Sequence, residues 1–249
     1  MTGRFVVLAG PSGVGKSPLV AALARLHPDL DAELTPVVLY NSRDPRPGES
    51  DGVDYHFRRR SEIERLAEQP GFVTCDVRGD LQSIDLGPLD ALLESGGSAF
   101  FEGNPFIPEA LRRAGVFDRY PTTTIFMSPL SEKEIEYLLV AERNVDLGSL
   151  VTDVMRRKLL RRTRKQKGEL SLPDLENIER RAASAIGELR LAWRYDHVIA
   201  NHDGEDSENW NAFYHPIGDA FTALESLVAL LSDRPAPRVE RWTEGLVPD

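Results

Sequence analysis

The sequence predicts an α/β protein in which a parallel sheet is covered by helices on both faces. Strand-like apolar runs alternate with helical patterns, the arrangement that gives parallel strands joined by crossover helices. A glycine-rich segment also lies where the first of these strands meets the first helix, as in folds that bind phosphate at this junction. The expected strands are Phe5–Ala9, Phe72–Asp76, Ser98–Glu102, Thr122–Met127 and His197–Ala200.

The composition favours a globular protein. With 249 residues, 41% of them hydrophobic and 28% charged, the chain is long enough for one sizeable α/β domain. A net charge of −10 disfavours a general nucleic-acid binder. No apolar run approaches the ~20 residues of a membrane helix, and the N-terminal run is too short for a signal peptide, so we expect a cytoplasmic protein. Cys75 is the single cysteine and is expected to be a small buried side chain.

The glycine-rich segment reads GPSGVGKS and fits the pattern G-x4-G-K-S/T of a phosphate-binding P-loop. Glycines let the backbone form a ring of N–H groups around a phosphate, a lysine adds charge and a serine hydroxyl can hold Mg²⁺. We therefore expect a nucleoside triphosphate with Mg²⁺. Proline at position 18 has no N–H, so the loop should lack one contact. The residues expected to bind ATP here are Gly10, Ser12, Gly13, Val14, Gly15, Lys16 and Ser17.

A polar, turn-rich segment at residues 41–57 has the composition of an anion-binding site. It reads NSRDPRPGESDGVDYHF, and arginines offer a rigid fork to phosphate oxygens while tyrosine adds a hydroxyl donor. The segment resembles the monophosphate-binding segment of guanylate kinases, which reads T-T-R-x-P-R-x-G-E followed by D-G-x-D-Y-x-F. This resemblance implies that Arg43, Arg46 and Tyr55 grip the phosphate of GMP and that Glu49 braces the arginines.

The resemblance covers about residues 4–203 in outline and implies a domain organisation. A single guanylate kinase-like domain is expected over residues 1–232, with an irregular tail at 233–249. The implied parts of the domain are a core at 1–34, 94–150 and 182–232, a monophosphate-binding insert at 35–93 and a helical lid at 151–181.

The part of the family that reads the base matches this chain less well. Where the family has a serine, a glutamate and a Tyr-Tyr-Gly-Ser/Thr turn, this chain has Leu39, then Thr74 or Asp76, then Asp80–Ser83. Guanine needs an acceptor facing its N1 and N2 donors and a donor facing O6. Asp76, Asp80 and Ser83 are candidates to supply these groups; equally, the pocket accepts a different base. The sequence therefore predicts a monophosphate more strongly than it predicts guanine.

The segment after the third expected strand resembles the family motif L-D-I-D-x-Q-G, with Glu102 and Asn104 at positions that approach the nucleotides and the metal. A carboxylate at the carboxyl end of a central strand is where α/β sheets present ligand groups. Glu102 is thus expected to hold Mg²⁺ with Ser17, and the alternative is a carboxylate that only holds a loop. The expected monophosphate-binding set is Arg43, Arg46, Glu49, Tyr55, Asp76, Ser83, Glu102 and Asn104.

The only dense basic block, residues 156–167, resembles the family's lid. The resemblance implies that arginines close over ATP, with Arg161 and Arg181 acting beside Lys16 and Arg43 in catalysis. A solvated charged face is an alternative; a nucleic-acid patch would need interleaved aromatic residues, which the block lacks. Downstream, residues 195–203 resemble the strand D-Y-V-I-V-N-D-D, which implies that Asn201 contacts the adenine of ATP. His202, in place of an aspartate, is expected to be structural.

The resemblance implies ATP-dependent, Mg²⁺-assisted phosphorylation of a purine nucleoside monophosphate, GMP or dGMP, to the diphosphate. One alternative is a specialised kinase for a modified or noncanonical (deoxy)nucleoside monophosphate. Another is a non-catalytic module that binds phosphopeptide or nucleotide, which would have no use for Lys16. The expected partners are ATP and a nucleoside monophosphate, in a monomer or homodimer. Near the C-terminus, a stripe at helical spacing predicts a core helix containing Ile217, Phe221, Leu224, Val228 and Leu231.

Overall fold

The structure is a computed structural model that describes residues 3–46 and 48–248. Pro47, inside the arginine-rich segment, lies outside the described residues. A five-stranded sheet has the order β2-β7-β1-β8-β9, and its outer pairs, β2 with β7 and β8 with β9, are parallel. All five residues of the central strand β1 are buried, which explains its unbroken apolar run. The strands are β1 (Phe5–Ala9), β2 (Leu34–Pro36), β7 (Ser98–Gly103), β8 (Thr122–Ser128) and β9 (His197–Ala200). The predicted α/β class is confirmed.

The strand expected at Phe72–Asp76 lies in a second sheet, so its assignment to the parallel sheet is wrong. It is β5 (Phe72–Val77), which pairs antiparallel with β6 (Asp80–Asp85). Arg78 and Gly79 join the two strands with φ angles of 60° and 94°, as a two-residue hairpin turn requires. The apolar run predicted a strand but carried no information about its partner. The place in the parallel sheet is taken by β2, a three-residue strand too short to leave a pattern.

The second sheet has the order β4-β3-β6-β5. Its remaining strands are β3 (Leu39–Asn41) and β4 (Tyr55–Phe57), which are parallel and pair Leu39 with Tyr55. On its other side β3 pairs with β6, placing Asn41 opposite Gln82. The arginine-rich segment therefore forms the connection from β3 to β4.

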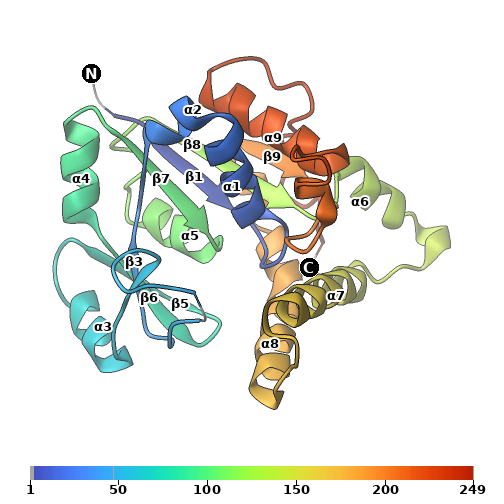
Figure 1. Ribbon diagram of the computed structural model, residues 1–249, viewed down its shortest axis with the longest axis horizontal. Helices are drawn as coiled ribbons and strands as arrows, with labels where there is room; N and C mark the ends of the chain where they lie inside the picture. The colour runs from blue at the N-terminus through green and yellow to red at the C-terminus, as the bar shows by residue number, and fades with distance from the viewer. Residues whose placement is uncertain (1–2, 47, 249) are drawn as a thin grey trace. The chain divides into compact units, whose positions relative to one another are not determined.

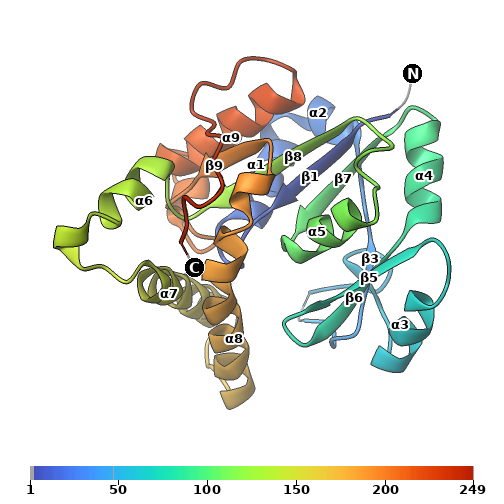
Figure 2. The same ribbon diagram turned by 180° about the vertical axis from the view of Figure 1, so that it is seen from behind.

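The chain divides into two compact units, and each is described by itself. The first, Glu33–Thr123 with the chain up to Val7, contains the second sheet and three helices: α3 (Arg60–Ala67), α4 (Leu86–Glu94) and α5 (Phe106–Arg113). Figure 2 shows α3 beside β5 and β6. Polar side chains begin two of these helices, since Asp85 accepts a hydrogen bond from Gly87 N in α4 and Asn104 Oδ1 accepts from Phe106 N in α5.

The second unit comprises Leu8–Ala32 and the chain from Thr124 onward. In it α7 and α8 lie side by side as a helical hairpin (Figure 1). Gly168, at φ 78°, ends α7, and a capping box between Ser171 and Asp174 begins α8. The helices are α1 (Lys16–Leu26), α2 (Pro28–Ala32), α6 (Glu132–Leu138), α7 (Leu147–Lys167), α8 (Leu172–Leu189) and α9 (Gly218–Leu231), with 3₁₀ turns at Ala141–Arg143, Ala192–Arg194 and Glu208–Trp210.

The helix α9 confirms the helical pattern near the C-terminus, but its stripe is only partly core. Leu224 and Val228 are buried, whereas Ile217 and Phe221 are 38% and 40% exposed. The expectation that these two residues are core is wrong, because at the start of α9 the buried side is instead formed by Ala220, which is 0% exposed. No helix in the described part of the chain is long and apolar enough to cross a membrane.

Two further expectations about burial can be compared with the structure. Cys75 is half-buried and not fully buried, and burial raises the pKa of its thiol to about 12. Residues 232–248 contain no helix, but they are docked on the sheet. Glu240 exchanges two backbone hydrogen bonds with Val198 of β9, and Trp242 is 3% exposed.

Candidate nucleotide-binding sites

The P-loop joins the end of β1 to the start of α1. Lys16 is the first residue of α1, and its side chain is 5% exposed. Its ammonium lies across the loop and donates hydrogen bonds to Gly10 O at 2.8 Å and Pro11 O at 3.0 Å. The loop thus surrounds a buried positive charge at a helix N-terminus, which is an arrangement suited to phosphate.

Two glycines of the loop are required by close packing. Gly15 has φ 109°, and a Cβ there would lie 2.6 Å from Asn201 Nδ2 and 2.9 Å from Trp210 Cζ2. Gly13 has φ 86°, and its Cβ would lie 3.1 Å from Leu159 Cδ2. The loop is therefore packed between the segment that follows β9 and the helix α7, and neither position admits a side chain.

Asn201, which the sequence predicts to contact adenine, is fully buried behind the P-loop. Its Nδ2 donates to Val14 O at 2.7 Å and to Asp203 O at 2.5 Å. The side chain thus ties the loop after β9 to the backbone of the P-loop. Contact with adenine stays a prediction.

The basic block on α7 is bound to an acidic loop. Arg161 Nε lies 2.6 Å from Asp206 Oδ2, and Arg162 pairs with Glu205 at 2.7 Å. Glu205 N in turn donates to Gly13 O at 3.3 Å, so α7, this loop and the P-loop form one packed group. Arg161 is 63% exposed and already paired, and a role for it in catalysis stays a prediction.

Lys158 is the most buried cation of the block. Its side chain is 6% exposed, and within the described residues its ammonium has no hydrogen-bond partner. Burial lowers its pKa to about 8, although Asp206 and Asp203 act in the opposite direction. Arg181, the other predicted catalytic arginine, lies half-buried in α8, and its role is likewise untested.

In the first unit, the connection from β3 to β4 holds a braced arginine. Arg43 makes two parallel hydrogen bonds to the carboxylate of Glu49, at 2.6 and 2.7 Å. The guanidinium carbon lies 5.0 Å from the centre of the Tyr55 ring, and Glu49 also accepts from Arg46 N at 2.7 Å. Glu49 therefore fixes both the guanidinium of Arg43 and the turn that contains Arg46.

The ionisation of this group suits an anion site. Burial raises the pKa of Glu49, but hydrogen bonds from Arg43 and Arg46 and their charges outweigh it, and the pKa is lowered overall. Burial raises the pKa of Tyr55, with Arg43 opposing and Glu102 adding to the rise. At neutral pH the site thus combines an ionised brace, a charged guanidinium and a phenol that can donate.

The residues predicted to read the base have other partners. Ser83 is fully buried, with its Oγ 2.7 Å from Thr74 Oγ1. Asp76 is 54% exposed and accepts a hydrogen bond from Gly79 N in the hairpin turn. A residue that the sequence did not single out, Gln82, is buried and accepts from Asn104 Nδ2 at 2.9 Å. A glutamine inside a short strand gives no local signal of such a contact.

Glu102 lies in β7, and Asn104 follows that strand directly. The described residues contain no group of three His, Cys, Asp or Glu side chains placed to hold a metal. A magnesium ion bound chiefly by phosphates and water needs no such cage. The exposed hydroxyl residue Ser17, in the first turn of α1, fits this mode of binding.

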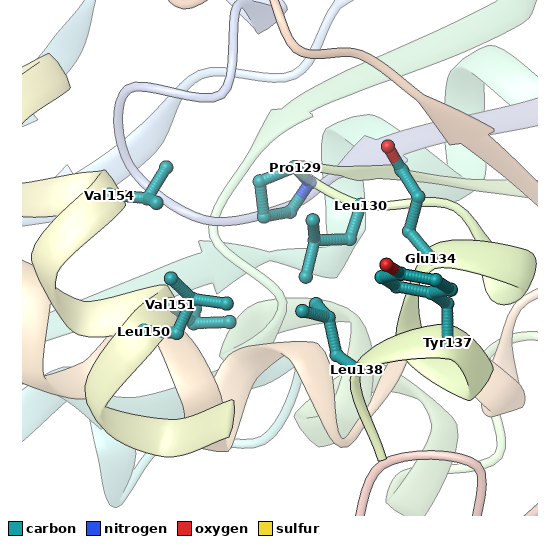
Figure 3. A pocket seen from close by; sticks show the side chains of 8 residues that line it. All are labelled: Pro129, Leu130, Glu134, Tyr137, Leu138, Leu150, Val151 and Val154. Carbon is teal, nitrogen blue, oxygen red and sulfur yellow. The ribbon is translucent and has the colours of Figure 1, made fainter. Parts of the chain in front are cut away.

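A separate apolar cavity of about 420 Å³ lies between α6 and the beginning of α7 (Figure 3). At its edge Glu134 bonds His202 Nε2 at 2.8 Å, and Asp219 lies 2.5 Å from His202 Nδ1. Burial lowers the pKa of His202, but the carboxylates of Asp219 and Glu134 outweigh this effect and raise the pKa overall. This pairing fits a structural role. The cavity is lined by Pro129, Leu130, Glu134, Tyr137, Leu138, Leu150, Val151 and Val154, none of which was predicted to bind nucleotide.

Comparisons with known proteins identify relatives of the chain. A family model described as "Guanylate kinase" matches residues 2–143. A guanylate kinase from Rhodococcus jostii is 32% identical over 204 residues, which cover 81% of each chain. One from Alkalilimnicola ehrlichii is 30% identical over 82% of this chain and 83% of that protein. A crystal structure of guanylate kinase from Anaplasma phagocytophilum, 18% identical, has a TM-score of 0.55 over 96% of this chain and 90% of that one, and so supports the fold.

Proposed function

This chain belongs to the guanylate kinase family, and we propose that it transfers the γ-phosphoryl group of ATP to GMP, giving ADP and GDP. It is thus a nucleoside monophosphate kinase. Two features together carry the proposal. Arg43 is joined to Glu49 by two hydrogen bonds beside Tyr55, and the same chain has a P-loop that includes its lysine, Lys16. A purely binding module would need only the first of these.

Each part of the site has a defined task in this proposal. The P-loop amides and Lys16 bind the phosphates of ATP, while Arg43, Arg46 and Tyr55 bind the phosphate of the acceptor. Magnesium, bound with ATP and touched by Ser17, would neutralise charge on the transferred group. No covalent enzyme intermediate is required, because an acceptor phosphate oxygen is itself the nucleophile once it is aligned.

The electrostatics of the acceptor site support this order of tasks. The guanidinium of Arg43 has two of its donors held by Glu49, so it cannot swing away when the phosphate arrives. A pre-oriented donor loses less conformational entropy on binding than a free side chain. Tyr55 keeps its proton at neutral pH and so can donate to a phosphate oxygen.

The direct test is formation of ADP and GDP from Mg-ATP and GMP, separated by chromatography. We expect GMP-dependent ADP formation by the natural protein. Lys16→Ala should lower the rate at least about 1,000-fold, because Lys16 supplies the positive charge that stabilises the transferred phosphoryl group. Circular dichroism would verify that the variant is folded. Turnover by the variant at the rate of the natural protein would refute the proposal. So would ADP formation at the same rate with and without GMP.

A further inference from the structure

The first unit contains a group of three carboxamides that no part of the proposed mechanism uses. Asn41 in β3 and Gln82 in β6 are cross-strand partners, with side chains 0% and 6% exposed. Asn104, at the end of β7, bonds to Gln82. Backbone pairing continues past β3, since Ser42 N donates to Leu81 O, and Arg43 follows Asn41 by two residues.

The orientation of each amide is fixed by a backbone N–H, which can only donate. Arg43 N donates to Asn41 at 3.2 Å, so that contact is the side-chain oxygen and Nδ2 is left over. Phe106 N and Ile107 N donate to Asn104 at 3.0 and 3.3 Å, so Asn104 must turn its Nδ2 toward Gln82 Oε1.

The same reasoning settles Gln82, whose oxygen is taken by Asn104 and whose free atom is consequently Nε2. Within the described residues, Asn41 Nδ2 is buried without a hydrogen-bond partner. Gln82 Nε2 is the remaining donor of its amide, because Asn104 occupies the oxygen. An unpaired buried donor costs free energy, so such a pair gains from a ligand that offers acceptors. The polar atoms that the three carboxamides can still offer to a ligand are therefore N–H donors.

An edge that carries only donors selects among purines. Guanine and hypoxanthine present two acceptors, O6 and N7, on one edge, whereas adenine presents N7 and the N6 amino donor. An amino group facing Gln82 Nε2 would place donor against donor and leave both unpaired. Thr74 and Ser83 bond to each other, and Asp76 accepts from Gly79 N in the hairpin turn, so the 2-amino group should contribute less to recognition than the O6 edge.

We propose that Gln82, held by Asn104, determines the base specificity of the acceptor site by donating from Nε2 to O6 of a 6-oxopurine monophosphate. GMP and IMP are then both acceptors, and AMP is rejected. Asn104 is a positioning residue, and Asn41, the cross-strand partner of Gln82, adds a second donor. The inference rests on the proposed kinase function for its physiological meaning, but the binding of the monophosphate can be measured without ATP.

The test is calorimetric titration of GMP, IMP and AMP into the full-length protein in the absence of ATP, followed by turnover of each with Mg-ATP. The natural protein should bind IMP within about tenfold of GMP and bind AMP at least about 30-fold more weakly, since one good base contact discriminates by roughly 10- to 100-fold. Gln82→Glu replaces the donor with an acceptor and should lower the GMP-to-AMP affinity ratio by about 30-fold or more. Gln82→Met, which is uncharged, should lower it by about tenfold.

The matched control is Gln69→Glu, the same change at an exposed glutamine of the same unit, which should leave the ratio unchanged. Asn104→Asp keeps the oxygen that caps α5 but presents a second oxygen to Gln82, so it should lower the ratio without altering the KM for ATP. IMP binding as weak as AMP binding, or an unchanged ratio in folded Gln82→Glu and Gln82→Met, would overturn the inference. Selective binding without ADP formation would refute the kinase function and leave the base specificity standing.

Discussion

At Pro18 the P-loop lacks a backbone donor within the first turn of α1. Replacement by threonine restores an N–H and adds a hydroxyl beside the phosphates, and one such hydrogen bond contributes about 1 kcal/mol. We therefore expect Pro18→Thr to lower the KM for ATP by roughly three- to tenfold. Steady-state kinetics at saturating GMP measures this. Pro28→Thr, the same change at the start of α2, is the control, and an equal KM in both variants would contradict the prediction.

The role of a single residue could be predicted where the residue belongs to a short motif with fixed spacing. The P-loop and the Arg43–Glu49 segment are short runs whose spacing carries the chemistry, so the sequence predicted which side chains would gather there. Gln82 depends on Asn104, which lies 22 residues away after β7, so no short run of sequence connects the two. The role of Asp76 beside the base stays a prediction, and its hydrogen bond to the hairpin turn could not be foreseen from the strand pattern.

The buried Lys158 allows the packing of α7 against the P-loop to be tested through the pH dependence of stability. Lys158 has a pKa of about 8 in the folded protein against 10.5 for a free lysine. Between these values the unfolded chain binds more protons than the folded one, so stability rises with pH across the window. Relative to Lys158→Met, the natural protein should thus gain up to about 3 kcal/mol in unfolding free energy between pH 8 and pH 10.5.

Urea unfolding of both proteins at several pH values in this window measures the gain. Other titrating groups are common to the two proteins and cancel in the difference. Lys165→Met, at an exposed position of the same helix, should run parallel to the natural protein. If Lys158→Met also runs parallel, the ammonium is not desolvated and the described packing of α7 on the P-loop is wrong.

Helices and strands were predicted well where the amphipathic or apolar pattern is long. They were predicted poorly where pairing with another strand, and not the local pattern, determines the element. β1 and β9 have the predicted bounds, while β2 is only three residues long and left no signal. The basic block on α7 could be predicted as a lid by resemblance, but its anchoring to residues 203–206 could not. That anchoring depends on acidic side chains about 45 residues further along the chain.

At the scale of the whole molecule, the fold class followed from alternation of strands and helices, whereas the path of the final segment did not. Proline punctuation in that segment predicted an irregular conformation. It concealed the fact that Glu240 pairs with β9, the edge strand of the parallel sheet. An edge strand with free N–H and C=O groups invites association, and covering it is a common protection.

The segment that covers β9 is anchored by a buried tryptophan, Trp242. Trp242 is 3% exposed and donates from Nε1 to Glu240 Oε2 at 2.8 Å, while that carboxylate also accepts from Glu132 N at the start of α6. Trp242→Ala removes a large buried side chain and should lower the unfolding free energy by about 3 kcal/mol. It should also promote concentration-dependent association, because the edge of β9 loses its partner.

Denaturant unfolding and light scattering at increasing protein concentration provide the two measurements. Glu244→Ala, at an exposed position in the same segment, is the control and should change neither. Trp242→Phe keeps much of the apolar contact and should fall between the two. A Trp242→Ala protein as stable as the control would mean that the segment is held by its backbone pairing with Val198 alone; loss of stability without association would mean that the edge of β9 stays covered after the indole is removed.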